Sequence, residues 1–198
     1  MIVLSSSTVL SQTDTVVFDR DNIGNDTIVH FDAGANRDVL DFTAWLTNVS
    51  SASGSEESQV RINTTLVAET AIVNNSVSIV DFDTVETAFG TGTIAFDTLS
   101  NDQLLAALNG TATGGNAGTF VAAAGNAQLV GNDMYSIILI ERDGNSGTPA
   151  DNFGEYLVAQ VQSDSAGGNT AFESVTIIGS IDFAQTETVG GFTAVNFA

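Results

Sequence analysis

Short apolar runs alternate with clusters of Gly, Asn, Ser, Thr and Asp along the whole chain. Runs of this length, rich in β-branched residues and bounded by turn-forming residues, are typical of β-strands joined by tight turns. The pattern therefore predicts a mainly β protein. The expected strands are Thr15–Phe18, Thr27–Phe31, Val39–Phe42, Val60–Val67, Ser76–Phe82, Thr93–Phe96, Gln128–Gly131, Met134–Arg142, Tyr156–Gln162 and Glu173–Phe183.

The last three of these runs form the clearest unit. They are separated by Asp143–Gly147 and Asp164–Asn169, two segments rich in turn formers. Consecutive strands with such connections favour an antiparallel meander. We expect an antiparallel β-sandwich or meander over residues 50–198 and a separate segment over residues 1–49, or a single domain over residues 1–198.

One short helix interrupts the β pattern. Ser100 is suited to cap Asn101–Asn109, with Gln103 at the capping-box position and Gly110 as the stop signal. A second helical turn is expected over Ala44–Leu46. The buried stripe of the longer helix consists of three leucines at helical spacing, Leu104, Leu105 and Leu108.

Composition narrows the classes of partner. The 198 residues include 24 acids and only four basic residues, so the formal net charge is −20, while 43% hydrophobic residues suffice for a core. A nucleic-acid partner is excluded because few basic residues are present to neutralise phosphates. The chain has no cysteine, so it has no disulfide or thiolate chemistry. Such an acid excess destabilises a compact state unless cations screen it, and adaptation to high salt is an alternative explanation.

Aspartates are concentrated near the start of the chain. Carboxylates this close repel one another unless a cation lies among them, and calcium takes six to eight oxygen ligands in flexible geometry. The alternative is that these residues cap turns and face water. The predicted calcium ligands in this cluster are Asp19, Asp21, Asp26, Asp32, Asp38 and Asp41.

A second acidic cluster lies in the connection between two of the longest strands. It lacks the ligand spacing of an EF-hand loop, so metal binding and a solvated turn both stay open. The predicted metal ligands here are Asp143, Asn145, Asp151 and Asn152, with Glu155 beside them.

Two motifs near the start of the chain resemble the calcium-binding RTX (hemolysin-type) family. Asp21–Val29 fits the nonapeptide G-G-x-G-x-D-x-U-x from Gly24 onward, although Asp21 and Asn22 replace its first two glycines. Phe31–Phe42 resembles the closing F-D-x-G-x-x-D-x-L-D-F segment of that family. The resemblance covers about a quarter of the chain, and it implies bound calcium rather than a complete β-roll, because one repeat lacks stacked neighbours.

The same resemblance implies a route out of the cell. Met1–Ser7 has neither the basic nor the apolar region of a signal peptide, and no apolar run is long enough to span a membrane. RTX-like proteins are exported by type I secretion from an uncleaved C-terminal signal, and the apolar end Val189–Ala198 looks like such a terminus. We therefore expect an extracellular or cell-surface protein.

No catalytic set accompanies these features. His30 is the single histidine, and we expect it on the face of a strand. The motifs H-E-x-x-H and G-x-S-x-G of RTX-like proteases and lipases are absent. The sequence therefore predicts a protein that is not an enzyme.

The expected function is that of a non-enzymatic extracellular structural protein, a calcium-stabilised subunit of a surface layer or filament. Copies would associate through strand edges and through the apolar segments Met1–Leu10 and Val189–Ala198, with Phe197 among the anchors. One alternative is the accessory or secretion domain of a secreted hydrolase. Another is a calcium-dependent carbohydrate-binding module for a cell-surface glycan, whose stacking surface would come from Trp45, Tyr135 and Tyr156.

Overall fold

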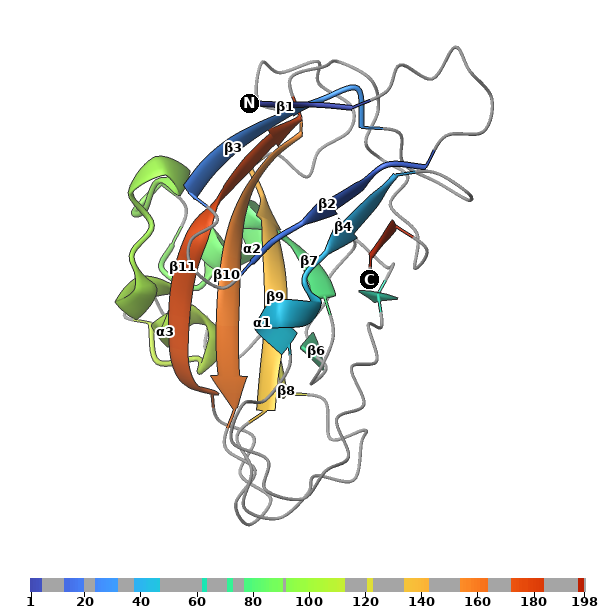
Figure 1. The fold of residues 1–198 in the computed structure, drawn as a ribbon. Helices are drawn as coiled ribbons and strands as arrows, with labels where there is room; N and C mark the ends of the chain where they lie inside the picture. Colours follow the sequence, from blue (N-terminus) through green and yellow to red (C-terminus); the bar gives the residue numbers. More distant parts are fainter. Residues whose placement is uncertain are drawn as a thin grey trace, which may run out of the picture.

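The computed structural model describes thirteen stretches of the chain, which together hold its sheets and helices (Figure 1). The expected strand Gln128–Gly131 lies outside the described residues, as does most of Val60–Val67. The described residues are 1–4, 13–19, 24–31, 38–46, 62–63, 71–72, 77–90, 92–112, 121–122, 134–142, 154–163, 172–183 and 196–197.

Strands predominate over helices, so the prediction of a mainly β protein is confirmed. The helices are α1 (Thr43–Leu46), α2 (Phe82–Thr87), the 3-10 helix η1 (Phe96–Thr98) and α3 (Asn101–Leu108). The strands are β1 (Ile2–Val3), β2 (Thr15–Val17), β3 (Gly24–Val29), β4 (Val39–Asp41), β5 (Ile62–Asn63), β6 (Ala71–Ile72), β7 (Val77–Asp81), β8 (Val121–Ala122), β9 (Met134–Glu141), β10 (Glu155–Ser163) and β11 (Phe172–Phe183).

Seven strands form one mixed sheet in the order β1-β3-β11-β10-β9-β7-β5. Its centre, β9-β10-β11, is the expected antiparallel meander. The flanking pairs β1-β3, β3-β11, β7-β9 and β5-β7 are parallel, so the antiparallel arrangement holds only for the centre. Two further parallel pairs, β2-β4 and β6-β8, lie outside this sheet.

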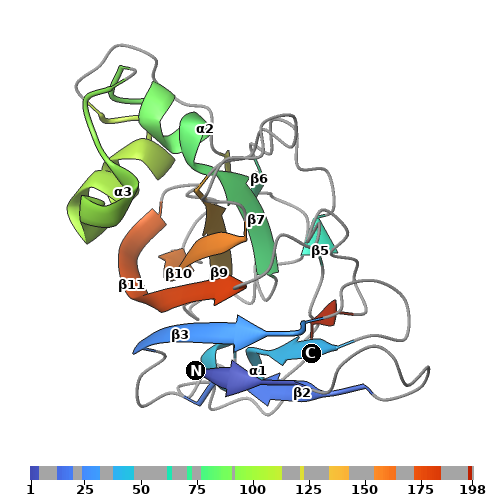
Figure 2. The ribbon, with the colours of Figure 1, turned by 90° about the horizontal axis from the view of Figure 1, so that it is seen from above.

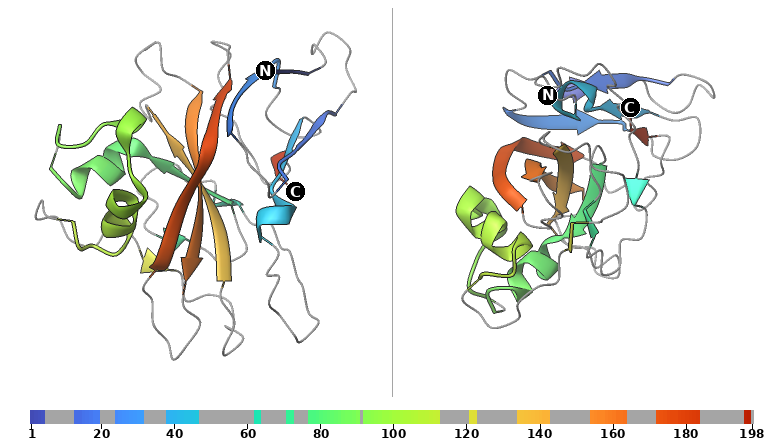
Figure 3. Two further views of the ribbon diagram at one scale, coloured as in Figure 1. Left: turned by 60° about the vertical axis from the view of Figure 1, so that its left-hand side comes forward. Right: turned by 90° about the horizontal axis from the view of Figure 1, so that it is seen from below.

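A bulge shapes the side of the sheet that carries the predicted calcium segment. Val158 pairs with Gly179 whereas Ala159 pairs with Ile177, so Ile178 is an extra residue in β11. An extra residue bends its strand and increases the local twist. β11 continues past this point to pair with β3, and Figures 2 and 3 show β3 and β1 lying beside β2 and β4, opposite β9 and β10. This second layer produces a sandwich.

Strand β9 is apolar and buried from Ile137 to Ile140 because both of its faces are covered there. Ile137 and Leu139 of β9 face the layer that contains β2 and β4, while Ile138 and Ile140 face the helices. Successive side chains in a strand point to opposite faces, so a strand between two layers needs apolar residues at every position.

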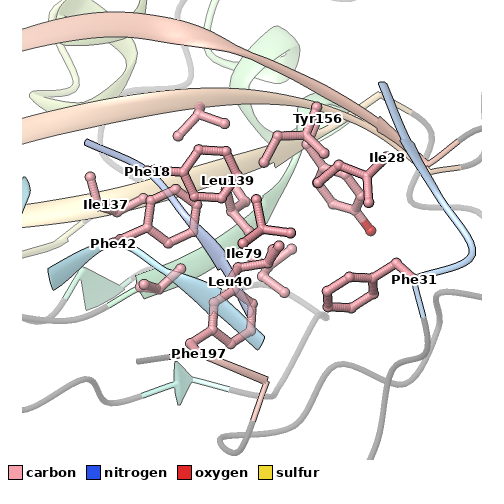
Figure 4. Packing of buried hydrophobic residues seen from close by; sticks show 14 of the residues in the cluster. Phe18, Ile28, Phe31, Leu40, Phe42, Ile79, Ile137, Leu139, Tyr156 and Phe197 are labelled. Atoms are coloured by element: carbon pink, nitrogen blue, oxygen red, sulfur yellow. The ribbon is translucent and has the colours of Figure 1, made fainter. Parts of the chain in front are cut away.

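An aromatic cluster fills the space between the two β layers (Figure 4). The Phe18 and Phe42 rings are stacked with centroids 4.6 Å apart, and the Tyr156 ring meets Phe183 edge to face at 5.7 Å. Residues of both expected segments, 1–49 and 50–198, therefore share one core. Its buried members are Val16, Phe18, Ile28, Phe31, Leu40, Phe42, Trp45, Val77, Ile79, Ile137, Leu139, Tyr156, Val158, Ile181, Phe183 and Phe197.

The helices α2 and α3 cover the other face of the sheet (Figure 3). Helix α3 begins as predicted: Gln103 N donates to Ser100 Oγ at 3.2 Å, and Ser100 N donates to Gln103 Oε1 at 2.9 Å. Ala107, rather than Leu105, joins Leu104 and Leu108 in the buried face. No helix among the described residues is both long and apolar enough to cross a membrane.

Two local predictions were wrong. Phe82 begins α2 instead of ending a strand, although Phe82, Val85 and Phe89 have helical spacing that could have indicated this. The expected strand Thr93–Phe96 is a turn that leads into η1, because Gly90 and Gly92 reverse the chain with positive φ angles. The expected turn of helix over Ala44–Leu46 is confirmed as α1.

The described residues near the C-terminus belong to the core. Phe197 is 6% exposed and forms a parallel bridge with Leu40, and the buried Asn196 donates Nδ2–H to the carbonyl of Asp38 at 2.9 Å. The expectation that Phe197 anchors a partner is therefore wrong, because the apolar contacts of its ring are made within its own chain. The rest of Val189–Ala198 lies outside the described residues.

Candidate functional site

A cavity of about 390 Å³ opens where β3, β10 and β11 extend beyond the helices, beside η1. Four carboxylate residues and one arginine line it. Its lining residues are Asn25, Asp26, Thr27, Phe96, Asp97, Arg142, Glu155, Tyr156, Leu157, Ser180, Ile181 and Asp182.

Strand register explains why polar groups gather here. Asp182 pairs with Thr27 of β3 on one side and with Glu155 of β10 on the other. Directly paired residues on neighbouring strands point to the same face, so these three side chains lie together. One pair further along, Ser180 Oγ donates to Asn25 Oδ1 at 3.0 Å. The sheet thus presents a row of oxygen atoms on its helix-side face, opposite the side chains of Ile28, Ile181 and Phe183 in the core.

Arg142 supplies the positive charge at the cavity. Its Nη1 lies 2.5 Å from Glu155 Oε2, its Nη2 lies 2.9 Å from Asp97 Oδ2, and its guanidinium sits 5.3 Å from the centroid of the Phe96 ring. The hydrogen bond to Glu155 is the main cause that raises the pKa of Arg142. Since Arg142 already pairs with two of the four carboxylates, the cavity keeps a surplus of negative charge.

The negative charge of Asp182 is unfavourable in the folded protein. Burial raises the pKa of Asp182 above its ordinary value, and the nearby negative charge of Glu155 raises it further. Both causes disfavour the ionised carboxylate, so a bound cation would be stabilising at this position.

The cavity brings together residues from both predicted acidic clusters. Asp26 belongs to the first cluster and Glu155 flanks the second, although 129 sequence positions separate them. The second cluster lies between the described residues Arg142 and Gly154. Arg142 lines the cavity, and Gly154 precedes the lining residue Glu155. The predicted ligands Asp21, Asp32, Asp143, Asn145, Asp151 and Asn152 lie outside the described residues.

The other described members of the first cluster do not line the cavity. Asp38 is 2% exposed, and its Oδ1 accepts the backbone N–H of Asp14 at 2.9 Å. Asp41 Oδ1 accepts the backbone N–H of Thr43 at 2.9 Å, where α1 begins. Asp19 is exposed just after β2. Asp38 and Asp41 therefore cap backbone N–H groups, which is the role expected from the sequence as the alternative to metal binding.

The donor chemistry of the cavity fits a hard cation. Carboxylate, amide and hydroxyl oxygens from Asp182, Asn25, Thr27 and Ser180 are the ligand types that calcium takes. Within the part of the chain that the structure describes, no group of three or more His, Cys, Asp or Glu side chains converges on one metal position. Calcium binding therefore stays a prediction.

Tyr156, Glu141 and Trp45 carry polar groups that are buried in the protein. Tyr156 OH donates to Oε1 of the buried Glu141 at 3.3 Å, and burial, followed by the charge of Glu141, raises the pKa of Tyr156 well above its usual value. Tyr156 and Trp45 are both buried, so neither offers a stacking surface to a glycan.

His30 follows β3 with φ of +67°, so the prediction that it lies on a strand face was wrong.

Sequence reasoning missed Asp97, Arg142 and Asp182 as cavity residues. The signal for Arg142 was available, because it ends a long strand of the predicted meander next to the turn-rich segment Asp143–Gly147, whereas Asp182 lies within its predicted strand and gave no such signal. Asp97 gave no such signal, since its segment was predicted to be part of the connection after a strand.

The comparisons with protein-family models, with curated proteins and with solved structures found no match to this chain.

Proposed function

We propose that this protein is a non-enzymatic extracellular structural protein, a calcium-stabilised subunit of a surface layer or filament. The observation that carries the proposal is the cavity in which Asp182 and Glu155 are paired on adjacent strands, with Thr27 of β3 beside Asp182. The formal charge of −20 opposes both folding and association, so a cation held in the cavity would favour both.

The assembly half of the proposal is supported by the sheet edge. Val3 of the edge strand β1 is 60% exposed and Met1 is 84% exposed, and no strand of the described part of the chain pairs with the outer side of β1. Exposed edges of this kind are templates for pairing with another chain. Calcium would lower the repulsion between copies, and the strand edge would set the direction of their contact.

Thermal unfolding with and without calcium tests the calcium half. A metal that binds only the folded state stabilises it by mass action, so calcium should raise the Tm and a chelator should reverse the rise. Asp26→Ala should lose much of that gain. Asp38→Ala is a poor probe, because it also removes the acceptor for Asp14 N.

Asp182→Asn gives the sharper result because its effects with and without calcium have opposite signs. Since the pKa of Asp182 is raised in the folded chain, the folded state binds a proton more tightly than the unfolded state. Stability without calcium should then fall as pH rises from the ordinary aspartate pKa, about 3.9, to the raised value. Asp182→Asn should therefore raise the Tm at neutral pH in chelator, with a gain that vanishes at low pH, and should weaken the stabilisation by calcium.

Glu173→Gln is the matched control, since Glu173 is an exposed carboxylate near the opposite end of β11. It should keep the full calcium effect. A wild-type Tm that does not respond to calcium would contradict calcium binding. If Asp182→Asn keeps the full rise of Tm with calcium, the metal binds outside this cavity.

A further inference from the structure

Strand β1 is attached to the sheet along one side only. It pairs in parallel with β3 at Ile2↔Ile28 and Val3↔Val29, and Leu4 N donates to the carbonyl of Val29 at 3.0 Å. Ile2 and Leu4 pack partly buried against the aromatic cluster, while Val3 points to solvent. So short a strand makes few hydrogen bonds, so its release costs little compared with unfolding the sheet.

Strand β3 offers more edge than β1 covers. β11 pairs with Gly24–Ile28 along one side of β3, whereas β1 reaches only Ile28 and Val29 on the other side. No strand among the described residues pairs with the outer edge of Asn25–Thr27. Among the described residues, the acceptor site for β1 is therefore at the end of the seven-stranded sheet.

The charge pattern of the sequence permits a contact between copies through β1. Residues 1–13 contain no acidic or basic side chain, and Asp14 is the first charged residue of the sequence. In a chain of formal charge −20, a strand without charged side chains approaches another copy with less repulsion than an acidic segment does.

We propose that copies are joined by exchange of β1: the β1 strand of one copy leaves its own β3 and takes the same position on β3 of the next copy. This inference rests on the proposed assembly function. The pairs Ile2↔Ile28 and Val3↔Val29 then form between copies with the register seen within one chain. Exchange of an identical element replaces each lost contact by the same contact, so it is a low-cost route to association. Continued from copy to copy in one direction, it builds a filament.

Disulfide trapping tests the exchange, because the chain has no cysteine of its own. Registered residues on neighbouring strands lie about 5 Å apart, within the range that a disulfide spans. Val3→Cys and Val29→Cys are made as separate single variants, mixed, assembled with calcium and oxidised. The exchange predicts a strong cross-linked species that contains one chain of each variant.

The Thr15↔Val39 pair provides the matched control. It is also a parallel pair of an exposed and a half-buried residue, but it joins β2 to β4. A mixture of Thr15→Cys and Val39→Cys should give only background cross-linking. Equal cross-linking in both mixtures would overturn the exchange.

Double variants supply the converse test. When Val3→Cys/Val29→Cys is oxidised as a monomer in chelator, the disulfide should hold β1 on β3 of its own chain. Assembly should then be blocked until a reductant is added. Thr15→Cys/Val39→Cys should assemble in either redox state. Assembly of the oxidised Val3→Cys/Val29→Cys variant would overturn the exchange and leave the proposed function standing.

Wild-type protein in the same series separates the two proposals. If it fails to assemble with calcium, the proposed function and the exchange both fall. If it forms only dimers that carry the Val3–Val29 cross-link, the exchange is reciprocal, which contradicts the head-to-tail exchange and the filament.

Discussion

At the residue scale, the join between β10 and β11 depends on a glycine. Gly154 has φ of +89°, and its carbonyl accepts Phe183 N at 2.9 Å. A Cβ built on Gly154 would lie 3.2 Å from the carbonyl oxygen of Phe183 and 3.3 Å from its Cβ. The neighbour in question is strand backbone, which has little freedom to move aside.

Substitution of two glycines separates the two causes of strain. Gly92 has φ of +80° but no atom within 4 Å of its would-be Cβ. Gly92→Ala should lose stability of order 1–3 kcal/mol from the backbone angle alone. Gly154→Ala should lose about 1–3 kcal/mol more from overpacking against Phe183. Chemical denaturation measures both, and equal losses would show that the contact with Phe183 is unimportant.

The aspartates show which roles of single residues can be predicted from a sequence and which cannot. Their number predicted a need for cations, and Asp26 does line a cavity rich in carboxylates. Asp38 and Asp41 look the same in the sequence, yet each accepts a nearby backbone N–H. Capping and metal binding use the same oxygen atoms, so only the folded position of each aspartate can separate them.

At the scale of elements, the sequence was most informative where the determinants are local. Helix α3 was predicted with its capping box, and the meander β9-β10-β11 with its long apolar runs. The parallel pairs could not be predicted, because the register of β3 against β11 joins residues 155 positions apart. The cavity depends on that register, which is why Thr27 and Asp182 were not expected to be neighbours.

The segment at residues 196–197 is an element whose role the structure changes. Since Phe197 lies in the aromatic cluster, Phe197→Ala should cost about 3–5 kcal/mol of stability, the usual loss for a buried phenylalanine. Val17→Ala is the control: Val17 is 63% exposed on β2, so the change should stay within about 0.5 kcal/mol. A Phe197→Ala variant with wild-type stability but lost assembly would instead restore Phe197 as an anchor for a partner.

At the scale of the whole molecule, charge and topology act in opposite directions. A formal charge of −20 keeps copies apart, whereas the edge strand β1, which has no charged side chain, lies beside a stretch of β3 that no described strand covers and offers a directional contact. Cation binding is the variable that shifts this balance. Simple ionic screening would also weaken the repulsion, but it would not depend on the identity of the cation.

Sedimentation velocity of the full chain therefore tests the central claim most directly. The protein is compared in chelator, in millimolar calcium, and in sodium chloride of the same ionic strength. We expect monomer in chelator and in sodium chloride, large assemblies in calcium, and return to monomer when chelator is added. Monomer under all three conditions, or equal assembly in calcium and sodium chloride, would contradict the claim that calcium controls assembly.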